Sequence, residues 1–189
     1  MAVTRNKKSK YFLAIVPPSP FYEEVLYWKN YFRINFNSKA SLRSPPHITL
    51  HMPFEWQSEK EEKLITPLSQ FVQKTNVLDV KLDGFGCFAP RVIFIQVTEN
   101  ILLNALQKTL SSFCKTELRL FNANRNDEPY QPHLTVAFRD LKKSVFKEAW
   151  DSVQEKSLKY KFTVNHISLL KHNGRSWDEY HDLKLNSMV

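Results

Sequence analysis

Apolar residues recur along the chain with two different periods, which predict an alternation of strands and helices. Short apolar runs bounded by proline or polar residues predict strands at 10–16, 47–54, 77–88, 91–98, 133–139, 158–171 and 177–185. Apolar residues spaced three and four apart predict helices at 18–34, 58–75, 100–118 and 140–156. Clusters of polar residues, proline and glycine between the apolar segments predict an asparagine-rich loop at 121–132 and a turn at Asn173-Gly174.

Two of the expected helices carry further signals. Ser58 precedes an acidic first turn formed by Glu59, Glu61 and Glu62, which is typical of a helix start because anionic side chains favour the helix dipole there. The helix at 100–118 is expected to bury a stripe made of Leu102, Leu103, Leu106 and Leu110. Trp28 and Trp150 are expected in the core for the same reason.

The order of elements repeats once along the chain. Pro46-His47-Ile48-Thr49-Leu50 and Pro132-His133-Leu134-Thr135-Val136 lie 86 residues apart, and each precedes a helix and two strands. We therefore expect one bilobal domain over residues 1–189, with repeat units at about 46–100 and 132–186. Two copies are too few for a solenoid, so the predicted body is closed and has two lobes.

The repeated motif places a histidine and a threonine two residues apart on a strand. Side chains at this spacing point to the same face, so His47 projects with Thr49, and His133 with Thr135. Two imidazoles that face one another across a cleft can act as base and acid in one step near neutral pH. Two hydroxyls between them can donate hydrogen bonds to the charged oxygens of a phosphodiester. These proton transfers need no metal ion.

Composition excludes several other classes of protein. The chain has 189 residues, of which 42% are hydrophobic and 13% aromatic, and this excludes a disordered chain. Three glycines are too few for a Walker-type phosphate loop. The stretch Gly84 to Ala89 fits a dinucleotide-binding fingerprint, but the extended run that follows at 92–95 argues against that interpretation.

Cysteine usage, the chain ends and the net charge indicate the cellular compartment and the class of partner. Cys87 and Cys114 form no paired motif, so we expect reduced thiols and neither a zinc ribbon nor a disulfide framework. The basic N-terminus leads into a short apolar run that ends in proline, which favours a first strand over a signal peptide. No apolar run reaches membrane-spanning length, and we expect a cytoplasmic protein. The net charge of +8 fits either a solubilising surface or a surface that attracts RNA.

The doubled His-x-Thr motif, the internal duplication and the chain length resemble the two-histidine phosphoesterase superfamily. Within it, the chain is most similar to bacterial and archaeal RNA 2′,3′-cyclic phosphodiesterases, which belong to the 2′-5′ RNA ligase family. Both histidine motifs match, and the stretch Phe88 to Ile95 is similar to the family's strand between the motifs.

The resemblance implies an α+β fold of two pseudo-twofold-related lobes. Each lobe is expected to be an antiparallel sheet with outer helices, and the lobes surround a central groove. The implied reaction is the opening of a cyclic phosphate, with Thr49 and Thr135 holding the phosphate. By the same analogy His133 acts as base toward water and His47 as acid toward the leaving oxygen.

Further residues are candidates for substrate contact. Tyr130 lies in the loop before His133 and could either stack on a base or anchor the loop. Four cationic side chains could contact RNA phosphate or remain solvated surface charges: Arg91, Arg125, Arg139 and Lys171. His51 shares the predicted face of His47 but lies too far along the strand to share a metal ion. It could line the groove, but we expect it to face solvent.

The sequence thus predicts a metal-independent phosphoesterase without a cofactor that opens a 2′,3′-cyclic phosphate. Its substrate is expected to be an RNA end or a small cyclic nucleotide, with no membrane and no obligatory protein partner. Two alternatives stay open: a joining activity that forms 2′-5′ RNA linkages, and a module that binds RNA without catalysis. A metal-dependent hydrolase is the remaining class, and a strong chelator would distinguish it.

Overall fold

The computed structural model describes residues 7–123 and 129–187. Its helices are α1 (Phe21–Phe36), α2 (Glu62–Val72), α3 (Ile101–Glu117) and α4 (Phe146–Asp151), with 3-10 turns η1 (Ala40–Arg43), η2 (Ser58–Lys60) and η3 (Lys143–Val145). Its strands are β1 (Lys8–Ile15), β2 (Ile48–Gln57), β3 (Leu78–Phe88), β4 (Val92–Val97), β5 (His133–Ala137), β6 (Lys159–Val164), β7 (His166–His172) and β8 (Trp177–Lys184). None of the described helices is long and apolar enough to cross a membrane.

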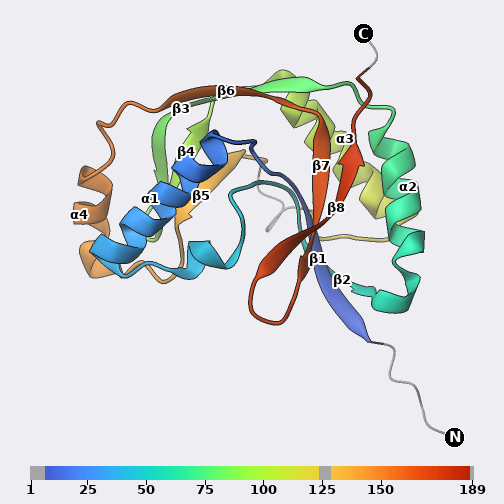
Figure 1. The fold of residues 1–189 in the computed structure, drawn as a ribbon, viewed down its shortest axis with the longest axis horizontal. Coiled ribbons are helices and arrows are strands. Elements are labelled where there is room, and N and C mark those ends of the chain that lie inside the picture. Colours follow the sequence, from blue (N-terminus) through green and yellow to red (C-terminus); the bar gives the residue numbers. More distant parts are fainter. Residues whose placement is uncertain (1–6, 124–128, 188–189) are drawn as a thin grey trace, which may run out of the picture.

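The eight strands form one curled sheet in the order β6-β3-β4-β5-β2-β1-β7-β8. All paired neighbours in this order run antiparallel, which confirms the predicted α+β class. The sheet has two four-stranded halves, joined at its centre by the register pair Ile48 on β2 and Leu134 on β5. Figure 1 shows α1 and α4 gathered at one side, and α2 and α3 at the opposite side. The two strands that begin with the repeated motif are therefore the central pair of the molecule.

The sequence repeat and the two halves of the sheet group the strands differently. β3 and β4 follow the first motif in the chain, and β7 and β8 follow the second, so the repeat aligns β3 with β7 and β4 with β8. In the sheet, however, β4 lies beside β5, whereas β8 lies at the edge and β1 takes the corresponding place beside β2. The pseudo-twofold relation is thus one of sheet position. The half made of β3, β4, β5 and β6 comes from one continuous stretch of chain, whereas the other half takes β1 and β2 from before that stretch and β7 and β8 from after it.

Strand β1 is buried on both faces. Tyr11, Leu13 and Ile15 belong to the main core between the sheet and the helices. Phe12 and Ala14 belong to a second small cluster on the other face, together with Leu170 and Trp177. This alternation follows the two-residue period of a strand. The second cluster lies on the same side of the sheet as His47, whose ring contacts Phe12.

Two predicted helices are wrong in detail. The helix expected at 140–156 reduces to η3 and α4, because the carboxylate of Asp140 accepts hydrogen bonds from Ser38, Lys39 and Ala40 and so belongs to a tertiary contact. In α3 the predicted leucine stripe is buried except for Leu102, which is 64% exposed. Leu102 adjoins the stripe on the helical wheel, but its exposure places it outside the face of α3 that packs in the core.

The strand expected at 158–171 is two strands that separate at Asn165. β6 pairs with β3 at one end of the sheet, and β7 pairs with β1 and β8 near the other end. The buried positions change phase from Phe162 and Val164 in β6 to Ile167 and Leu169 in β7, but this local pattern does not show with which strand each one pairs. Figure 1 shows β6 crossing the molecule between the two sides.

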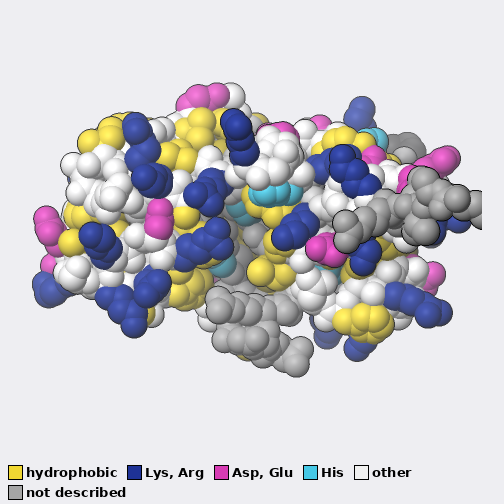
Figure 2. All heavy atoms as spheres, turned by 90° about the horizontal axis from the view of Figure 1, so that it is seen from below, with side chains coloured by type: hydrophobic (Ala, Val, Ile, Leu, Met, Phe, Trp, Pro, Cys, Tyr) yellow, Lys and Arg dark blue, Asp and Glu magenta, His cyan; other side chains and the backbone are white. Residues whose placement is uncertain are grey.

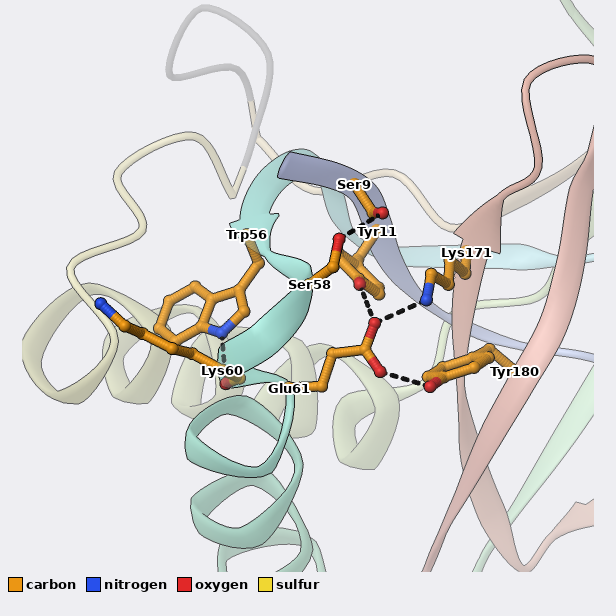
Figure 3. Close-up of polar contacts among 8 residues, drawn as sticks. All are labelled: Ser9, Tyr11, Trp56, Ser58, Lys60, Glu61, Lys171 and Tyr180. Atoms are coloured by element: carbon orange, nitrogen blue, oxygen red, sulfur yellow. Dashed lines mark hydrogen bonds and ion pairs between the residues drawn. The ribbon is translucent and has the colours of Figure 1, made fainter. Parts of the chain in front are cut away.

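The start of α2 differs from the predicted cap. Ser58 lies in η2, and its hydroxyl hydrogen-bonds the hydroxyl of Ser9 at 2.8 Å and caps no helix. Instead, the carboxylate of Glu61 accepts hydrogen bonds from Tyr11 and Tyr180 and forms an ion pair with Lys171 at 2.6 Å (Figure 3). These partners come from β1, β7 and β8, so Glu61 attaches the start of α2 to three strands. Lys171 thus forms an ion pair within the protein and does not offer a free ammonium to an RNA phosphate.

Replacing Glu61 with glutamine is expected to lower the free energy of unfolding by about 1–3 kcal/mol. The change removes the charge that Lys171 and the two tyrosines share in a partly buried cluster. Urea unfolding followed by tryptophan fluorescence measures the effect. Asp151→Asn breaks the exposed Lys147–Asp151 pair and is the matched control, with a much smaller expected loss because solvent screens this pair. Equal losses in the two variants would contradict this role of Glu61.

Candidate active site

The two repeated motifs meet crosswise at the centre of the sheet. Ile48 and Leu134 face each other in the antiparallel register between β2 and β5. Continued by one residue in each direction, this register sets His47 opposite Thr135 and Thr49 opposite His133. The structure therefore brings the four predicted residues together in a two-by-two arrangement.

The four motif side chains share one face of the sheet. Ile48 and Leu134 are fully buried in the main core. Because successive side chains alternate, His47, Thr49, His133 and Thr135 point to the opposite side, where all four are half-buried. Figure 2 shows histidine side chains near the middle of one face, with lysine and arginine side chains on either side. The surroundings favour the approach of an anion.

Both histidine rings are anchored in the same way. Nδ1 of His47 hydrogen-bonds the carbonyl oxygen of Pro45 at 2.7 Å, and Nδ1 of His133 bonds the carbonyl oxygen of Gln131 at 2.7 Å. A carbonyl oxygen only accepts, so Nδ1 carries the proton in each ring and Nε2 is left to accept or donate. Each anchor lies two residues before its histidine. The two histidines related by the pseudo-twofold axis therefore have the same tautomer, with the proton on Nδ1.

Aromatic side chains pack against each imidazole. The ring of Phe12 lies 4.9 Å from that of His47, and the rings of Phe88 and Phe94 lie 5.1 Å from that of His133. These contacts limit ring rotation and remove water from one side of each imidazole. Gly86 pairs with Phe94 across β3 and β4, and a Cβ there would lie 2.4 Å from the Phe94 ring. The glycine in the rejected fingerprint therefore makes room for a ring that packs against His133.

The surroundings lower the pKa of both histidines. Burial lowers the pKa of His47 to about 4, and the positive charges of Lys29 and His133 act in the same direction, against the hydrogen bond to Pro45. Burial also lowers the pKa of His133, against its hydrogen bond to Gln131. In the free protein at neutral pH both rings are neutral. A bound phosphate anion would favour protonation of either ring.

Acid is expected to destabilise the fold through His47. Its pKa is about 4 in the folded chain and about 6.5 when unfolded, so unfolding takes up a proton between these pH values. The free energy of unfolding therefore falls as the pH falls from about 6.5 to about 4, by about 3 kcal/mol from this group alone. Urea unfolding at several pH values measures the slope. His47→Gln should make the slope smaller, and an unchanged slope would contradict the assignment.

Three of the residues expected to contact substrate make contacts within the protein. The hydroxyl of Tyr130 donates to the carbonyl oxygen of Thr49 at 3.1 Å, and its ring packs against the core, so it anchors the loop before His133. Arg91 is exposed and donates to the carbonyl oxygen of Arg139 at 3.2 Å. The guanidinium of Arg139 lies over the ring of Phe138 at 5.5 Å. Arg125 lies outside the described residues.

The prediction that His51 faces solvent is wrong, because its side chain is fully buried. Thr49 pairs with Ala14 of β1, whereas His51 pairs with Leu13, so β2 contains one extra residue in this interval. Such a bulge reverses the alternation, and His51 points into the core with Leu13, away from His47. Its Nδ1 bonds the carbonyl oxygen of Met52, and burial lowers its pKa.

Lys29 is a residue near the site that the sequence interpretation missed. It is 1% exposed and lies in the buried stripe of α1 with Phe21, Val25 and Phe32. A lysine in the middle of an apolar helical stripe was the available signal, since a buried cation needs partners. Within the described residues, no group of three or more His, Cys, Asp or Glu side chains is placed to hold a metal ion.

Sequence comparison with known proteins finds a family match and relatives that are named as phosphoesterases. A model of the 2′-5′ RNA ligase superfamily matches residues 17–176. "Putative phosphoesterase GK0864" of Geobacillus kaustophilus is 29% identical over 175 residues, which cover 90% of this chain and 93% of that protein. A "Putative phosphoesterase" of Bacillus thuringiensis is 34% identical over 94 residues, covering 49% of this chain and 51% of that protein.

Solved structures share the fold. TT0787 of Thermus thermophilus superposes with a TM-score of 0.66 at 17% identity, over 95% of this chain and 100% of that one. LigT of E. coli, solved with 3′-AMP, has a TM-score of 0.67 at 19% identity, over 95% of this chain and 99% of that one. The family match covers most of the chain, including both histidine motifs. The chain therefore belongs to the 2′-5′ RNA ligase superfamily.

Proposed function

We propose that this protein is a phosphodiesterase that opens a 2′,3′-cyclic phosphate at an RNA end or on a small nucleotide. The observation that carries the proposal is the crosswise pair of His-Thr motifs on β2 and β5. Both imidazoles are held through Nδ1 by a backbone carbonyl, which leaves Nε2 for the substrate. One phosphoryl group between the two rings would then meet a base on one side and an acid on the other.

The reaction needs two proton transfers and no covalent intermediate. One imidazole takes a proton from water as the new bond from oxygen to phosphorus forms. The other gives a proton to the ribose oxygen as its bond to phosphorus breaks, and the product is a 2′- or 3′-monophosphate. The hydroxyls of Thr49 and Thr135 donate to the non-bridging oxygens, which carry the negative charge throughout.

A relative supports a nucleotide as ligand. LigT of E. coli has been solved with 3′-AMP. That molecule is the product expected when a 2′,3′-cyclic adenosine phosphate opens with departure of the 2′-oxygen. A fold shared over nearly the whole of both chains makes a ligand of similar size a reasonable first choice for this protein.

The experiment is hydrolysis of the four nucleoside 2′,3′-cyclic monophosphates and of an RNA oligomer that ends in a cyclic phosphate, each in strong chelator. We expect monoester product from at least one of them and an unchanged rate in chelator. Loss of activity in chelator would contradict a reaction carried by side chains alone. No product from any substrate by the folded protein would contradict the proposal.

A joining reaction is the second candidate, and the family match favours testing it. Attack by a 5′-hydroxyl of RNA in place of water on the same cyclic phosphate gives a 2′-5′ linkage when the 3′-oxygen leaves. The same base and acid serve both reactions. Incubation of two RNA oligomers, one with a cyclic phosphate end and one with a 5′-hydroxyl, separates a ligated product from a hydrolysed one on a denaturing gel.

A further inference from the structure

A pocket lies beside the first histidine motif. Its volume of about 350 Å³ is within the range of about 300–1,000 Å³ that is usual for small-molecule sites. In Figure 1 the turn between β7 and β8 lies near the connection from α1 to β2, and the pocket is formed between these segments and α1. Each wall contributes two of its principal residues: Tyr22 and Leu26 of α1, Arg43 and Pro45 before β2, and Trp177 and Glu179 of β8.

Two sets of contacts link the pocket to His47. Pro45 lines the pocket, and its carbonyl oxygen accepts the hydrogen bond from Nδ1 of His47 at 2.7 Å. Trp177 lines the opposite wall, and its ring lies 4.7 Å from that of Phe12. The ring of Phe12 in turn lies 4.9 Å from the imidazole of His47. The pocket therefore adjoins the proposed position of the phosphate on the His47 side of the central strand pair.

The wall formed by β8 faces the same side of the sheet as the motif side chains. Trp177 and Glu179 are two residues apart on β8, so their side chains point to one face. Glu179 pairs with Leu170 of β7, and Leu170 packs with Phe12 and Trp177 in the second small cluster. That cluster lies on the side of the sheet to which His47 points. One ligand can therefore contact the motif residues and this wall together.

The pocket combines aromatic rings with groups of opposite charge. Tyr22 and Trp177 are half-buried, and any nucleobase can stack on a ring of this kind. Arg43 supplies N–H donors, and the carboxylate of Glu179 supplies acceptors. Neither of these two side chains forms an ion pair with another of the described residues. Both therefore keep their hydrogen-bonding groups for a ligand.

Guanine is the base whose polar edges fit an arginine and a carboxylate together. Its N1–H and its exocyclic amine are adjacent donors, which one carboxylate can accept as a pair. Its O6 and N7 are acceptors, to which an arginine can donate two hydrogen bonds. Adenine, cytosine and uracil have no two adjacent donor groups on one edge. The charged groups of the pocket therefore favour guanine over the other three RNA bases.

We propose that this pocket binds the nucleobase of the substrate, and that Glu179 and Arg43 select guanine while Trp177 provides the stacking surface. The inference rests on the proposed function, because it places a nucleoside next to the cyclic phosphate that the two histidines open. The group recognised is a guanosine 2′,3′-cyclic phosphate, which a free nucleotide and an RNA end both present. Its base extends past His47 and away from His133.

The first test compares cyclic phosphates with and without a base. The wild-type protein should hydrolyse guanosine 2′,3′-cyclic phosphate with a kcat/KM roughly tenfold above those of the other three nucleosides, since a hydrogen bond to a charged group contributes about this much. Glu179→Gln and Arg43→Met should each raise KM for the guanosine compound roughly tenfold and leave kcat nearly unchanged. Glycerol 1,2-cyclic phosphate has the same five-membered ring without a base, so its hydrolysis should not change.

The matched control is Glu148→Gln, because Glu148 is an exposed carboxylate on α4 and does not line the pocket. It should keep the wild-type preference. An RNA oligomer that ends in the same guanosine group is run beside the free nucleotide, and the guanine preference should appear in both. A preference that survives in both pocket variants would overturn the proposal. So would an equal loss with glycerol cyclic phosphate, because the damage would then lie at the histidines.

The second test measures binding without turnover. Titration calorimetry with the four nucleoside 3′-monophosphates should show the tightest binding for the guanosine compound, and Glu179→Gln should weaken it roughly tenfold. Thermal unfolding shows that the variant compared is folded. If guanosine 3′-monophosphate binds selectively but no cyclic phosphate is hydrolysed, the proposed function fails and the guanine pocket stands. Equal binding of all four nucleotides by the wild-type protein would overturn the pocket assignment, even if hydrolysis is observed.

Discussion

Replacing either His47 or His133 with alanine is expected to lower turnover of a 2′,3′-cyclic phosphate by roughly 10²–10⁴-fold. The two rings have matching backbone anchors at Nδ1, so each offers Nε2 to the substrate and neither can substitute for the other. The loss should appear in kcat, because proton transfer occurs in the transition state. Steady-state kinetics on the purified variants gives both parameters.

The control for these variants is His181→Ala, because His181 is an exposed histidine on β8. It should retain wild-type activity. In the double variant the two losses should not multiply, since removal of one partner of a concerted pair already disables the step. Losses below tenfold for both single variants would contradict paired acid and base catalysis.

Replacing Thr49 or Thr135 with valine is expected to lower kcat/KM by roughly 10–100-fold each. Valine keeps the branched shape of the strand residue and removes only the hydroxyl that would donate to a charged phosphate oxygen. The hydrogen bond from Tyr130 to Thr49 uses the backbone carbonyl, so it survives the change.

Serine at either position should restore most of the activity, because it returns the hydroxyl. Thr109→Val serves as the control, since Thr109 is exposed on α3 and bonds only its own helix. A loss below twofold in both valine variants would mean that the threonines shape the strands and do not hold phosphate.

The grouping of the four motif residues could be predicted from the sequence because each His-Thr pair is set by local strand geometry. A two-residue spacing on a strand fixes which side chains share a face, and the doubled motif indicated that two such faces meet. The pairing of Ile48 with Leu134 then brings the four side chains together. The identical Nδ1 anchors were not predictable, because they depend on the path of the chain before each motif.

Other features depend on contacts that are distant in sequence. The bulge that turns His51 into the core arises from the register between β1 and β2, which no periodicity in β2 alone reveals. The shortening of the fourth helix reflects the contact of Asp140 with residues about 100 positions earlier. The sequence shows Lys29 as a charged residue in an apolar stripe, but it does not show that the ammonium donates to the carbonyl oxygens of Ser41 and Ser44.

The central claim is that the two His-Thr motifs act on one cyclic phosphate. The most direct measurement is ³¹P NMR of a nucleoside 2′,3′-cyclic monophosphate with the protein in ¹⁸O-labelled water and strong chelator. We expect the cyclic resonance to be replaced by one monoester resonance that carries a single ¹⁸O, and the replacement to be lost in His47→Ala and in His133→Ala. Persistence of the cyclic resonance with the folded wild-type protein, or conversion at the wild-type rate by both variants, would contradict the claim.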